Sequence, residues 1–563
     1  MSPTRFIKPG WISSPSNVAE SIFRHPILPA DNAGMTKAAV VLTTLNAKYI
    51  HASLGLRYLM ANLAKYGSQE LRDRSVLKEF TISRNRQEVV QELLALDPAI
   101  IGFGVYIWNV SQTLEVIRQI KTLRPTIKVI LGGPEVSHET EVQEIVALAD
   151  HVITGWGEVS FPKLCLQLLS SAGAPESVDK RLNPLGPAKI ILGEQLPLDE
   201  IELPYGQFRD EDLDHRILYV EASRGCPFKC EFCLSSLDKT AWPFDLDRFL
   251  AEISRLFDRG ARQFKFVDRT FNLKVENSLR ILQFFLDRLS PDLTVHFEVI
   301  PDYLPERLKD LIVRFPPGVL QFEVGVQTFN VEVQSLISRK QNNDKTIANI
   351  GWLVENSSAH LHADLIFGLP GESASSFARG FDRLYALGPH EIQLGLLKRL
   401  RGTPIARHDR SHGMIYSEKP PYAVLQSAAV SAEEIRRFTR LARYWDLVAN
   451  SGRFNQSLRL LTDGLSAYAA FSDFSDWLWK QVGETANLTP EQLVDAVYEY
   501  LTDVRSLDVE NVRSSLLSDY LASGARASPK SLRQLLRNQP VKLEAQARKR
   551  SFRQSRNKLI TQG

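Results

Sequence analysis

The sequence predicts an α/β protein that continues into an all-helical region. From residue 37 onward, short and fully apolar segments alternate with amphipathic helical segments, which is typical of parallel sheets covered by helices. Beyond Pro404 this alternation stops and helix-start signals become frequent. With 563 residues, the chain is long enough for three or four domains.

The composition restricts the kinds of protein that this chain can be. A hydrophobic share of 44% and a charged share of 24% are ordinary for a globular protein. No apolar run approaches the roughly 18 residues of a membrane span, and the N-terminus lacks the apolar core of a signal peptide. We therefore expect a cytoplasmic protein with no membrane partner. The net charge of +3 is too small to indicate nucleic acid as a partner.

The first domain is predicted between residues 36 and 171. Residues 1–35 before it are rich in proline and lack periodicity, so we expect an extended arm. Five strand–helix units then predict a doubly wound domain of flavodoxin-like type, in which ligands bind beyond the carboxyl ends of the strands. The expected strands are AAVVLTTL, VLKEFTI, AIIGFGVYIW, KVILGGPE and HVITGW, and the expected helices cover 54–63, 89–96, 113–123, 142–148 and 161–169.

The turns of this domain do not fit a dinucleotide. A dinucleotide needs glycines in the turn after the first strand, whereas residues 45–49 contain none. Glycines instead follow the fourth and fifth strands, as GGPE at 132–135 and GWGE at 155–158, and leave room for something broad and flat. The alternative is a scaffold that binds nothing, in which the aromatic side chains of these turns only pack.

A second set of strand–helix units is predicted between residues 213 and 405. Residues 172–212 before it contain five prolines and little periodicity, which is typical of a linker. Helices such as 246–257 and 276–289 are expected between the strands. The expected strands are RILYVEAS (216–223), RQFKFVD (262–268), LTVHFEVI (293–300), VLQFEVGVQT (319–328), LHADLIFGLPG (361–371) and HEIQLGLLKRL (390–400).

Three of the four cysteines, Cys226, Cys230 and Cys233, lie in the sequence GCPFKCEFC. Thiolates are the usual ligands of iron–sulfur clusters, and three that hold a four-iron cube leave one iron free to bind something else. Zinc is the alternative, but a closed zinc site needs four ligands, and no fourth cysteine or histidine lies close by. A disulfide would leave an odd cysteine. We therefore predict a [4Fe-4S] cluster, and expect Cys165 to be a buried packing residue of a helix.

The cysteine spacing, with Phe232 just before the last cysteine, resembles the signature of the radical S-adenosylmethionine (SAM) superfamily. The resemblance implies a partial (β/α)6 barrel with the cysteines on the loop after its first strand. It also implies that SAM chelates the free iron. One electron from the cluster then cleaves SAM to methionine and a 5′-deoxyadenosyl radical.

Polar groups at the carboxyl ends of barrel strands face the site of such a fold. Asp268 ends the second strand, where the superfamily has a glycine-rich motif that this chain lacks. Side chains of the third and fourth strands and one arginine downstream resemble positions that meet the ribose and the carboxylate of SAM, and GLPGE after the fifth strand lets the backbone pass close to adenine. For the charged residues, structural ion pairs are the alternative. The expected SAM contacts are Asp268, Glu298, Glu323, Gln327, Arg339, Gly368 and Gly371.

Placed before such a core, the first domain resembles the cobalamin-binding domain of cobalamin-dependent radical SAM proteins. The Asp-x-His-x-x-Gly signature that supplies an axial histidine elsewhere is absent, so we expect cobalamin without histidine on cobalt. Tyr106 and Trp108 are candidates for that face of cobalt by their position alone. The expected cobalamin contacts are Thr44, Leu45, Asn46, Tyr106, Trp108, Gly132, Gly133, Pro134, Glu135, Gly155, Gly157 and Glu158.

Residues 406–540 are predicted to form a helical domain. Ser431 with Glu434, and Thr489 with Gln492, have the spacing of capping boxes. In cobalamin-dependent radical SAM proteins, such C-terminal additions often shape the substrate pocket. Residues 541–563 are locally basic and predict a solvated tail, with a contact to RNA or a partner as the alternative.

The resemblance implies a methyltransferase that acts on an unactivated carbon or phosphorus centre. One SAM would methylate reduced cobalamin, and a second would supply the radical that abstracts hydrogen from the substrate, which then takes the methyl group from cobalt. A small-molecule or peptide substrate and a reducing partner such as flavodoxin or ferredoxin are expected. The alternatives are a radical cyclisation or rearrangement without net methylation, and a non-catalytic sensor of cobalamin or the cluster. A transfer-RNA methylthiotransferase would carry a second cysteine triplet in its first domain, where this chain has only Cys165.

Overall fold

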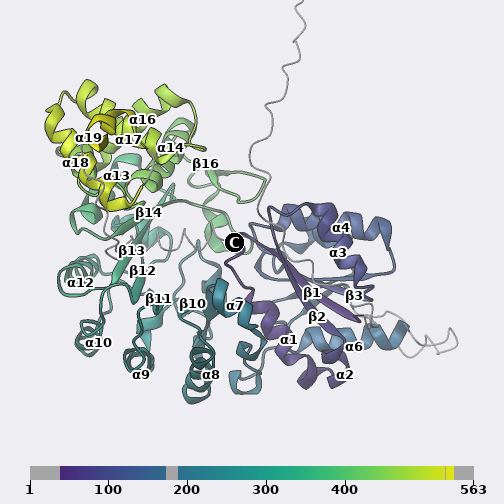
Figure 1. Cartoon of the computed structure of the whole chain (residues 1–563). Coiled ribbons are helices and arrows are strands. Elements are labelled where there is room, and N and C mark those ends of the chain that lie inside the picture. Colours follow the sequence, from purple (N-terminus) through teal and green to yellow (C-terminus); the bar gives the residue numbers. More distant parts are fainter. Residues whose placement is uncertain (1–37, 173–187, 526–527, 538–563) are drawn as a thin grey trace, which may run out of the picture. The chain divides into compact units, whose positions relative to one another are not determined.

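The computed structural model of the chain describes residues 38–172, 188–525 and 528–537 (Figure 1). The predicted arm at residues 1–35 and the predicted tail at 541–563 lie outside these residues.

The first sheet has six parallel strands in the order β2-β1-β3-β4-β5-β6. The order of its first five strands is that of a doubly wound, flavodoxin-like sheet, as predicted. Every residue of β1 is buried, because this strand lies between two others and has helices on both faces. The strands are β1 Val40–Asn46, β2 Ser75–Thr81, β3 Ile100–Gly104, β4 Lys128–Gly132, β5 His151–Thr154 and β6 Ile190–Leu192.

Helices cover both faces of this sheet (Figure 1). One hydrophobic core packs the strands against α3, α4 and α5, and a second core packs them against α1, α2 and α6. Cys165 is buried in the second core, as expected. The helices are α1 Leu54–Tyr66, α2 Gln69–Asp73, α3 Arg86–Ala95, α4 Val110–Leu123, α5 Glu144–Leu148 and α6 Ser160–Ala172.

The segment that the sequence predicts as a linker contributes to the first sheet. Strand β6 pairs with β5, with Val152 opposite Ile190. Its side chains are exposed or half-buried, and its apolar run is three residues long within a proline-rich segment, so the sequence did not indicate a strand of the sheet. The helix α7, Asp210–His215, then leads into the second sheet, and residues 173–187 lie outside the described part of the chain.

The second sheet also has six parallel strands, in the order β14-β13-β12-β11-β10-β7. This sequential order is that of an open, partial (β/α)6 barrel. The strands are β7 Leu218–Val220, β10 Gln263–Phe266, β11 Thr294–Val299, β12 Leu320–Gln327, β13 His360–Phe367 and β14 Glu391–Leu396. The intervening helices are α8 Leu246–Asp258, α9 Val275–Leu286, α10 Glu306–Ile312, α11 Val331–Leu336, α12 Asn343–Asn356 and α13 Ala374–Ala386.

Strand β12 is irregular at its carboxyl end. The register to β13 shifts between Gly325 and Gln327, and Gln327 has a φ of +69°. A Cβ atom at Gly325 would lie 2.5 Å from Nε2 of Gln327, so a larger residue there would displace the Gln327 side chain. The bulge therefore re-aims the last side chain of the strand.

The region after the barrel is mainly helical, as predicted, but it begins with an antiparallel pair of short strands, β15 Ile415–Tyr416 and β16 Val424–Gln426. Both capping boxes form: Ser431 and Glu434 cap α14, and Thr489 and Gln492 cap α17. Of the helices described, none is both long and apolar enough to cross a bilayer. The helices are α14 Ala432–Val448, α15 Ser457–Thr462, α16 Ala467–Val482, α17 Pro490–Glu499, α18 Val509–Ser523 and α19 Arg533–Arg537.

The helical region meets the barrel at the edge strand β14. The amide of Asn450 accepts a hydrogen bond from the backbone N–H of Ile392 at 3.1 Å and donates one to its carbonyl oxygen at 3.0 Å. The indole Nε1 of Trp445 donates to the same carbonyl at 3.0 Å. Side chains thus occupy the hydrogen-bonding groups that a further strand would use.

Candidate functional site

A pocket at the mouth of the barrel contains all three clustered cysteines. It has a volume of about 170 Å³ and is lined by the cysteine loop and by the carboxyl-terminal halves of β11, β12 and β13. We call it the cysteine pocket. The predicted site residues that line it are Cys226, Phe232, Cys230, Cys233, Glu298, Glu323, Gln327 and Arg339.

The three thiols of the cysteine pocket are the candidate cluster ligands. Cys226 and Cys230 are buried and Cys233 is half-buried. Nowhere in the described residues do three or more histidine, cysteine or acidic side chains converge on one ion position. A four-iron cube presents a different iron to each thiolate, so its ligands need not converge on one point. Burial raises the pKa of Cys226 and Cys230, so cluster assembly would displace protons from these thiols.

Arg339 links the thiols to the bulge of β12. Its Nη1 lies 3.6 Å from the sulfur of Cys230, and its Nη2 donates a hydrogen bond to the carbonyl oxygen of Gly325. Its Nε donates to Gln341 at 2.9 Å. The guanidinium is therefore fixed beside the cysteines, where it can pair with an anionic group of a ligand.

Two carboxylates of the pocket are paired with cations. Arg269 donates to both oxygens of Glu298, at 2.6 and 2.9 Å. Burial raises the pKa of Glu298, although Arg269 opposes this effect. Glu323 accepts from Lys265 at 3.3 Å and contacts His296 Nε2 at 3.0 Å. Although burial acts in the opposite direction, the His296 hydrogen bond and the charge of Lys265 hold the pKa of Glu323 well below its usual range.

Asp364, on β13, is a polar residue of the pocket that the sequence analysis did not select. Its Oδ1 lies 3.4 Å from His362 Nε2, and within the described residues this buried oxygen makes no hydrogen bond. Burial, together with the negative charges of Glu323 and Glu298, raises the pKa of Asp364 well above its usual value. A buried oxygen of this kind is available to a hydroxyl or amine of a ligand. The alternation of polar residues at 362 and 364 was the sequence signal for it.

Asp268 is not part of the cysteine pocket. Its Oδ2 accepts a hydrogen bond from the backbone N–H of Ala222 at 2.9 Å, and its Oδ1 accepts one from Ser223 Oγ at 2.6 Å. Burial raises its pKa to about 7. In this position Asp268 fixes the start of the cysteine loop rather than facing the thiols.

Gly368 and Gly371 also lie outside the lining of the cysteine pocket. Both have positive φ, +85° and +76°. A Cβ atom at Gly368 would lie 2.7 Å from Val424, and one at Gly371 would lie 3.0 Å from Leu336. The turn after β13 therefore needs both glycines for its own packing.

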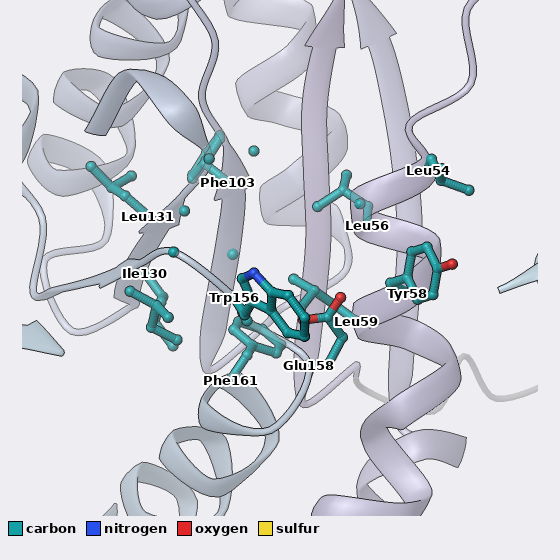
Figure 2. A pocket seen from close by; sticks show the side chains of 18 of the residues that line it. Leu54, Leu56, Tyr58, Leu59, Phe103, Ile130, Leu131, Trp156, Glu158 and Phe161 are labelled. Atoms are coloured by element: carbon teal, nitrogen blue, oxygen red, sulfur yellow. The ribbon is translucent and has the colours of Figure 1, made fainter. Parts of the chain in front are cut away.

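A second pocket, of about 300 Å³, lies at the carboxyl ends of β3, β4 and β5 beside α1 (Figure 2). We call it the glycine pocket, because glycines form much of its wall. Leu59, Trp156 and Phe161 lie together in it in Figure 2, and their rings and methyl groups give it an apolar interior. The predicted residues that line it are Tyr106, Gly132, Gly133, Gly155, Gly157 and Glu158.

The remaining predicted cobalamin contacts do not line this pocket. The side chain of Thr44 donates to the carbonyl of Gly104, Asn46 donates to Glu79, and the carbonyl of Leu45 accepts from Asn109. These bonds hold the first loop within its own domain.

Trp108 and Glu135 lie at the border of the glycine pocket, and Pro134 precedes Glu135. Trp108 is 46% exposed and stacks on Tyr106 with ring centroids 4.5 Å apart. Glu135 is buried and pairs with Arg401 at 3.0 Å. Arg401 belongs to the segment after β14, so this ion pair joins the GGPE turn to the barrel.

Two residues of the glycine pocket come from the barrel and were missed by the sequence analysis. Glu221 and Arg224 lie just before the cysteines, and both line this pocket. The signal available in the sequence was an arginine immediately before GCPFKC. The structure shows that this arginine is buried.

Three family models match the chain. Residues 40–165 match the B12 binding domain, and residues 220–384 match the Radical SAM superfamily. The chain is a radical SAM protein with a B12 binding domain. Its helical region, residues 410–562, matches a family described as a protein of unknown function, DUF4080.

Methyltransferases are among the curated relatives of this radical SAM protein. It is 24% identical over 325 residues to 2-(S-pantetheinyl)-carbapenam-3-carboxylate methyltransferase of Streptantibioticus cattleyicolor, which is 54% of this chain and 47% of that protein. It is 25% identical over 334 residues to the cobalamin-dependent radical SAM methyltransferase TokK of Streptomyces tokunonensis, which is 55% of this chain and 49% of TokK. The chain thus spans about half the length of the curated relatives that it matches.

Two solved structures share the fold. The cobalamin-dependent SAM radical enzyme OxsB, with aqua-cobalamin bound, has a TM-score of 0.56 at 14% identity and covers 94% of this chain and 84% of its own. The radical SAM methyltransferase TsrM of Kitasatospora setae, with cobalamin and a [4Fe-4S] cluster bound, has a TM-score of 0.53 at 16% identity and covers 80% of this chain and 100% of its own. At these identities the likeness concerns the fold.

Proposed function

We propose that the chain is a cobalamin-dependent radical SAM enzyme that methylates an unactivated carbon or phosphorus centre. The observation that carries the proposal is the cysteine pocket, in which Cys226, Cys230 and Cys233 open onto strand-end polar groups suited to SAM. The B12 binding domain beside it supports the choice of methyl transfer.

The residues of the cysteine pocket have separate tasks. The three cysteines would hold three irons of a [4Fe-4S] cluster and leave the fourth for SAM. Arg339 would pair with the SAM carboxylate, because it is fixed 3.6 Å from Cys230. Asp364 would accept hydrogen bonds from the ribose hydroxyls, because its buried Oδ1 accepts none from the described residues.

The glycine pocket would hold part of cobalamin. Its volume of about 300 Å³ is at the small end of the range for drug-sized ligands, roughly 300–1,000 Å³, so it would admit part of cobalamin but not the whole molecule. Trp108, which is exposed and stacked on Tyr106, presents a flat surface next to this pocket. When bound, cobalamin supplies the methyl group, and the cluster with SAM supplies the 5′-deoxyadenosyl radical.

A small molecule or a peptide is the proposed substrate, and a flavodoxin or ferredoxin the proposed electron donor. Radical cyclisation or rearrangement without net methylation is the second candidate, since it needs the same cofactors. A non-catalytic sensor is disfavoured by the polar strand ends of the cysteine pocket, because sensing needs no SAM site.

The test is anaerobic reconstitution of the full chain with iron, sulfide and hydroxocobalamin. Ultraviolet–visible absorption then gives the content of cluster and cobalamin, and electron paramagnetic resonance reports the reduced cluster before and after addition of SAM. A cluster signal perturbed by SAM, together with retained cobalamin, is the expected result. A cluster without cobalamin would overturn methyl transfer, and failure to form 5′-deoxyadenosine under reduction would favour the sensor. Transfer of label from methyl-labelled SAM to a product separates methylation from cyclisation.

A further inference from the structure

Arg224 stands between the two pockets. It ends the short strand β8, Ser223–Arg224, two residues before Cys226, and its side chain lines the glycine pocket. Its Nη2 pairs with Glu158 at 2.7 Å, and its Nε pairs with Glu221 at 2.8 Å. Glu158 belongs to the GWGE turn of the B12 binding domain, whereas Glu221 belongs to the barrel. One guanidinium therefore joins the two domains.

Aromatic rings contact the faces of the guanidinium, and carboxylates bind its nitrogens. It lies 4.5 Å from the ring of Tyr58, 4.8 Å from that of Trp156 and 5.5 Å from that of Phe244. Only 12% of the side chain is exposed. Lysine cannot reproduce this arrangement, because an ammonium has neither the planar fork nor the flat faces of a guanidinium.

Burial alone would lower the pKa of Arg224, but the combined effect of the negative charges of Glu221 and Glu158 is larger. They hold the pKa of Arg224 well above its usual value. The cation therefore persists at every pH at which the protein is handled.

A second contact joins the GWGE turn to the cysteine loop. Nε1 of Trp156 donates to a carboxylate oxygen of Asp238 at 3.3 Å. The backbone carbonyl of the same Asp238 accepts the N–H of Cys226 at 2.8 Å. Trp156 also contacts Arg224, so these two links between the domains share one aromatic side chain.

The backbone between Arg224 and Cys226 is closely packed. Gly225 has a φ of +82°, and a Cβ atom there would lie 2.8 Å from the backbone nitrogen of Ala241 and 2.9 Å from the carbonyl of Asp238. A larger residue at position 225 would therefore displace the loop that carries Cys226. On the other side, Gly155 and Gly157 line the glycine pocket in the same turn as Glu158, so a ligand there would contact the turn that pairs with Arg224.

We propose that Arg224 is a positioning residue that couples the two pockets, so that a ligand in the glycine pocket orders the cysteine loop and a cluster on the loop orders the glycine pocket. The inference rests on the proposed function, since it takes cobalamin and a [4Fe-4S] cluster as the two ligands. Whichever binds first orders the shared contacts, and the second then binds at a lower entropic cost. Because the coupling is an equilibrium property, each ligand must raise the affinity of the other by the same factor.

The experiment measures the dissociation constant of hydroxocobalamin, by quenching of tryptophan fluorescence, for cluster-free and cluster-loaded full-length chain under anaerobic conditions. In the wild type, the cluster should tighten cobalamin binding within the usual range of coupling, about 5- to 150-fold. The same ratio for Arg224→Lys should fall close to one. Arg259→Lys is the matched control, because Arg259 pairs with Asp210 at an exposed site outside both pockets, and it should keep the wild-type ratio.

A ratio of one in the wild type, or an unchanged ratio in Arg224→Lys, would overturn the inference and leave the proposed function intact. Failure of the wild-type chain to bind either ligand would overturn both. If Arg224→Lys does not fold, Trp156→Phe replaces it, since this variant keeps an aromatic ring beside Arg224 and removes the hydrogen bond to Asp238. It should lower the ratio, and an unchanged ratio would count against the coupling. A second readout is the resonance spectrum of the reduced cluster, which cobalamin should sharpen in the wild type and not in Arg224→Lys.

Discussion

Gln327 allows a sharp test, because its backbone and its side chain predict opposite effects of one substitution. Its φ of +69° lies in the left-handed region, which costs a non-glycine residue about 1–2 kcal/mol. Glycine avoids this cost but loses about 0.5–1 kcal/mol more chain entropy on folding. The side-chain Oε1 is buried and, in the described part of the chain, accepts no hydrogen bond, which adds roughly 1–3 kcal/mol of penalty. After allowance for lost packing, Gln327→Gly should stabilise the ligand-free chain by about 1 kcal/mol.

The same substitution should weaken SAM binding. Gln327 lines the cysteine pocket, and we place its amide against the ribose or carboxylate of SAM. One or two hydrogen bonds of about 0.5–1.5 kcal/mol each correspond to a loss of roughly tenfold in affinity. Stability is measured by thermal melting of the cluster-free chain, and affinity by equilibrium dialysis of SAM against the cluster-loaded chain.

Two further variants isolate the two effects. Gln327→Ala keeps the backbone strain and removes the amide, so SAM affinity should fall, while the gain in stability should be smaller than that of Gln327→Gly, because only the penalty of the buried oxygen is relieved. Ser506→Gly relaxes another left-handed residue, with a φ of +52°, outside both pockets, so the chain should gain stability and bind SAM normally. A Gln327→Gly protein that melts lower than the wild type and binds SAM equally well would refute the reasoning.

Three other predictions concern the cluster, the glycine pocket and pH. Cys226→Ala should abolish the cluster absorption after reconstitution, whereas Cys165→Ala, in the core of the first domain, should keep it; loss in both would contradict the assignment. Gly132→Val should fold yet lose cobalamin, since a Cβ atom there meets nothing closer than 3.8 Å and the side chain extends into the pocket; retained cobalamin would place it elsewhere. Burial raises the pKa of Glu372 to about 7, above its usual value of about 4.3, so the stability from its bound proton is full below about pH 4 and lost as pH rises through about 7. Melting of Glu372→Gln should therefore decline less between about pH 5 and 8, and parallel curves would argue against this.

The sheets were predictable because their signal is local. Strands such as β1 and β13 are buried runs of apolar or alternating residues, and the period of a strand is visible within a few positions. The capping boxes of α14 and α17 are equally local, since cap and partner are three residues apart. Strand β6 was not recognised as part of the sheet because its apolar run is only three residues long and lies in a proline-rich segment.

The site was predictable only in part, because its contacts join residues far apart in sequence. The cysteines were identifiable by their spacing alone. Asp268 ends a strand, as a site residue would, but its carboxylate binds Ala222 and Ser223, and only the folded chain reveals this. Arg224 meets Glu158 through a contact between domains, which no local pattern predicts.

The contacts of Asn450 and Trp445 with Ile392 set a limit on how this chain can be divided. An open parallel sheet that ends in a bare strand offers a template on which other chains can add strands. Here an amide and an indole occupy the backbone N–H and carbonyl of Ile392 on that edge, where a further strand would have to pair. A fragment cut before α14 would uncover β14, and we expect it to self-associate instead of behaving as an autonomous catalytic core. The helices after the barrel therefore also cover an edge of the sheet.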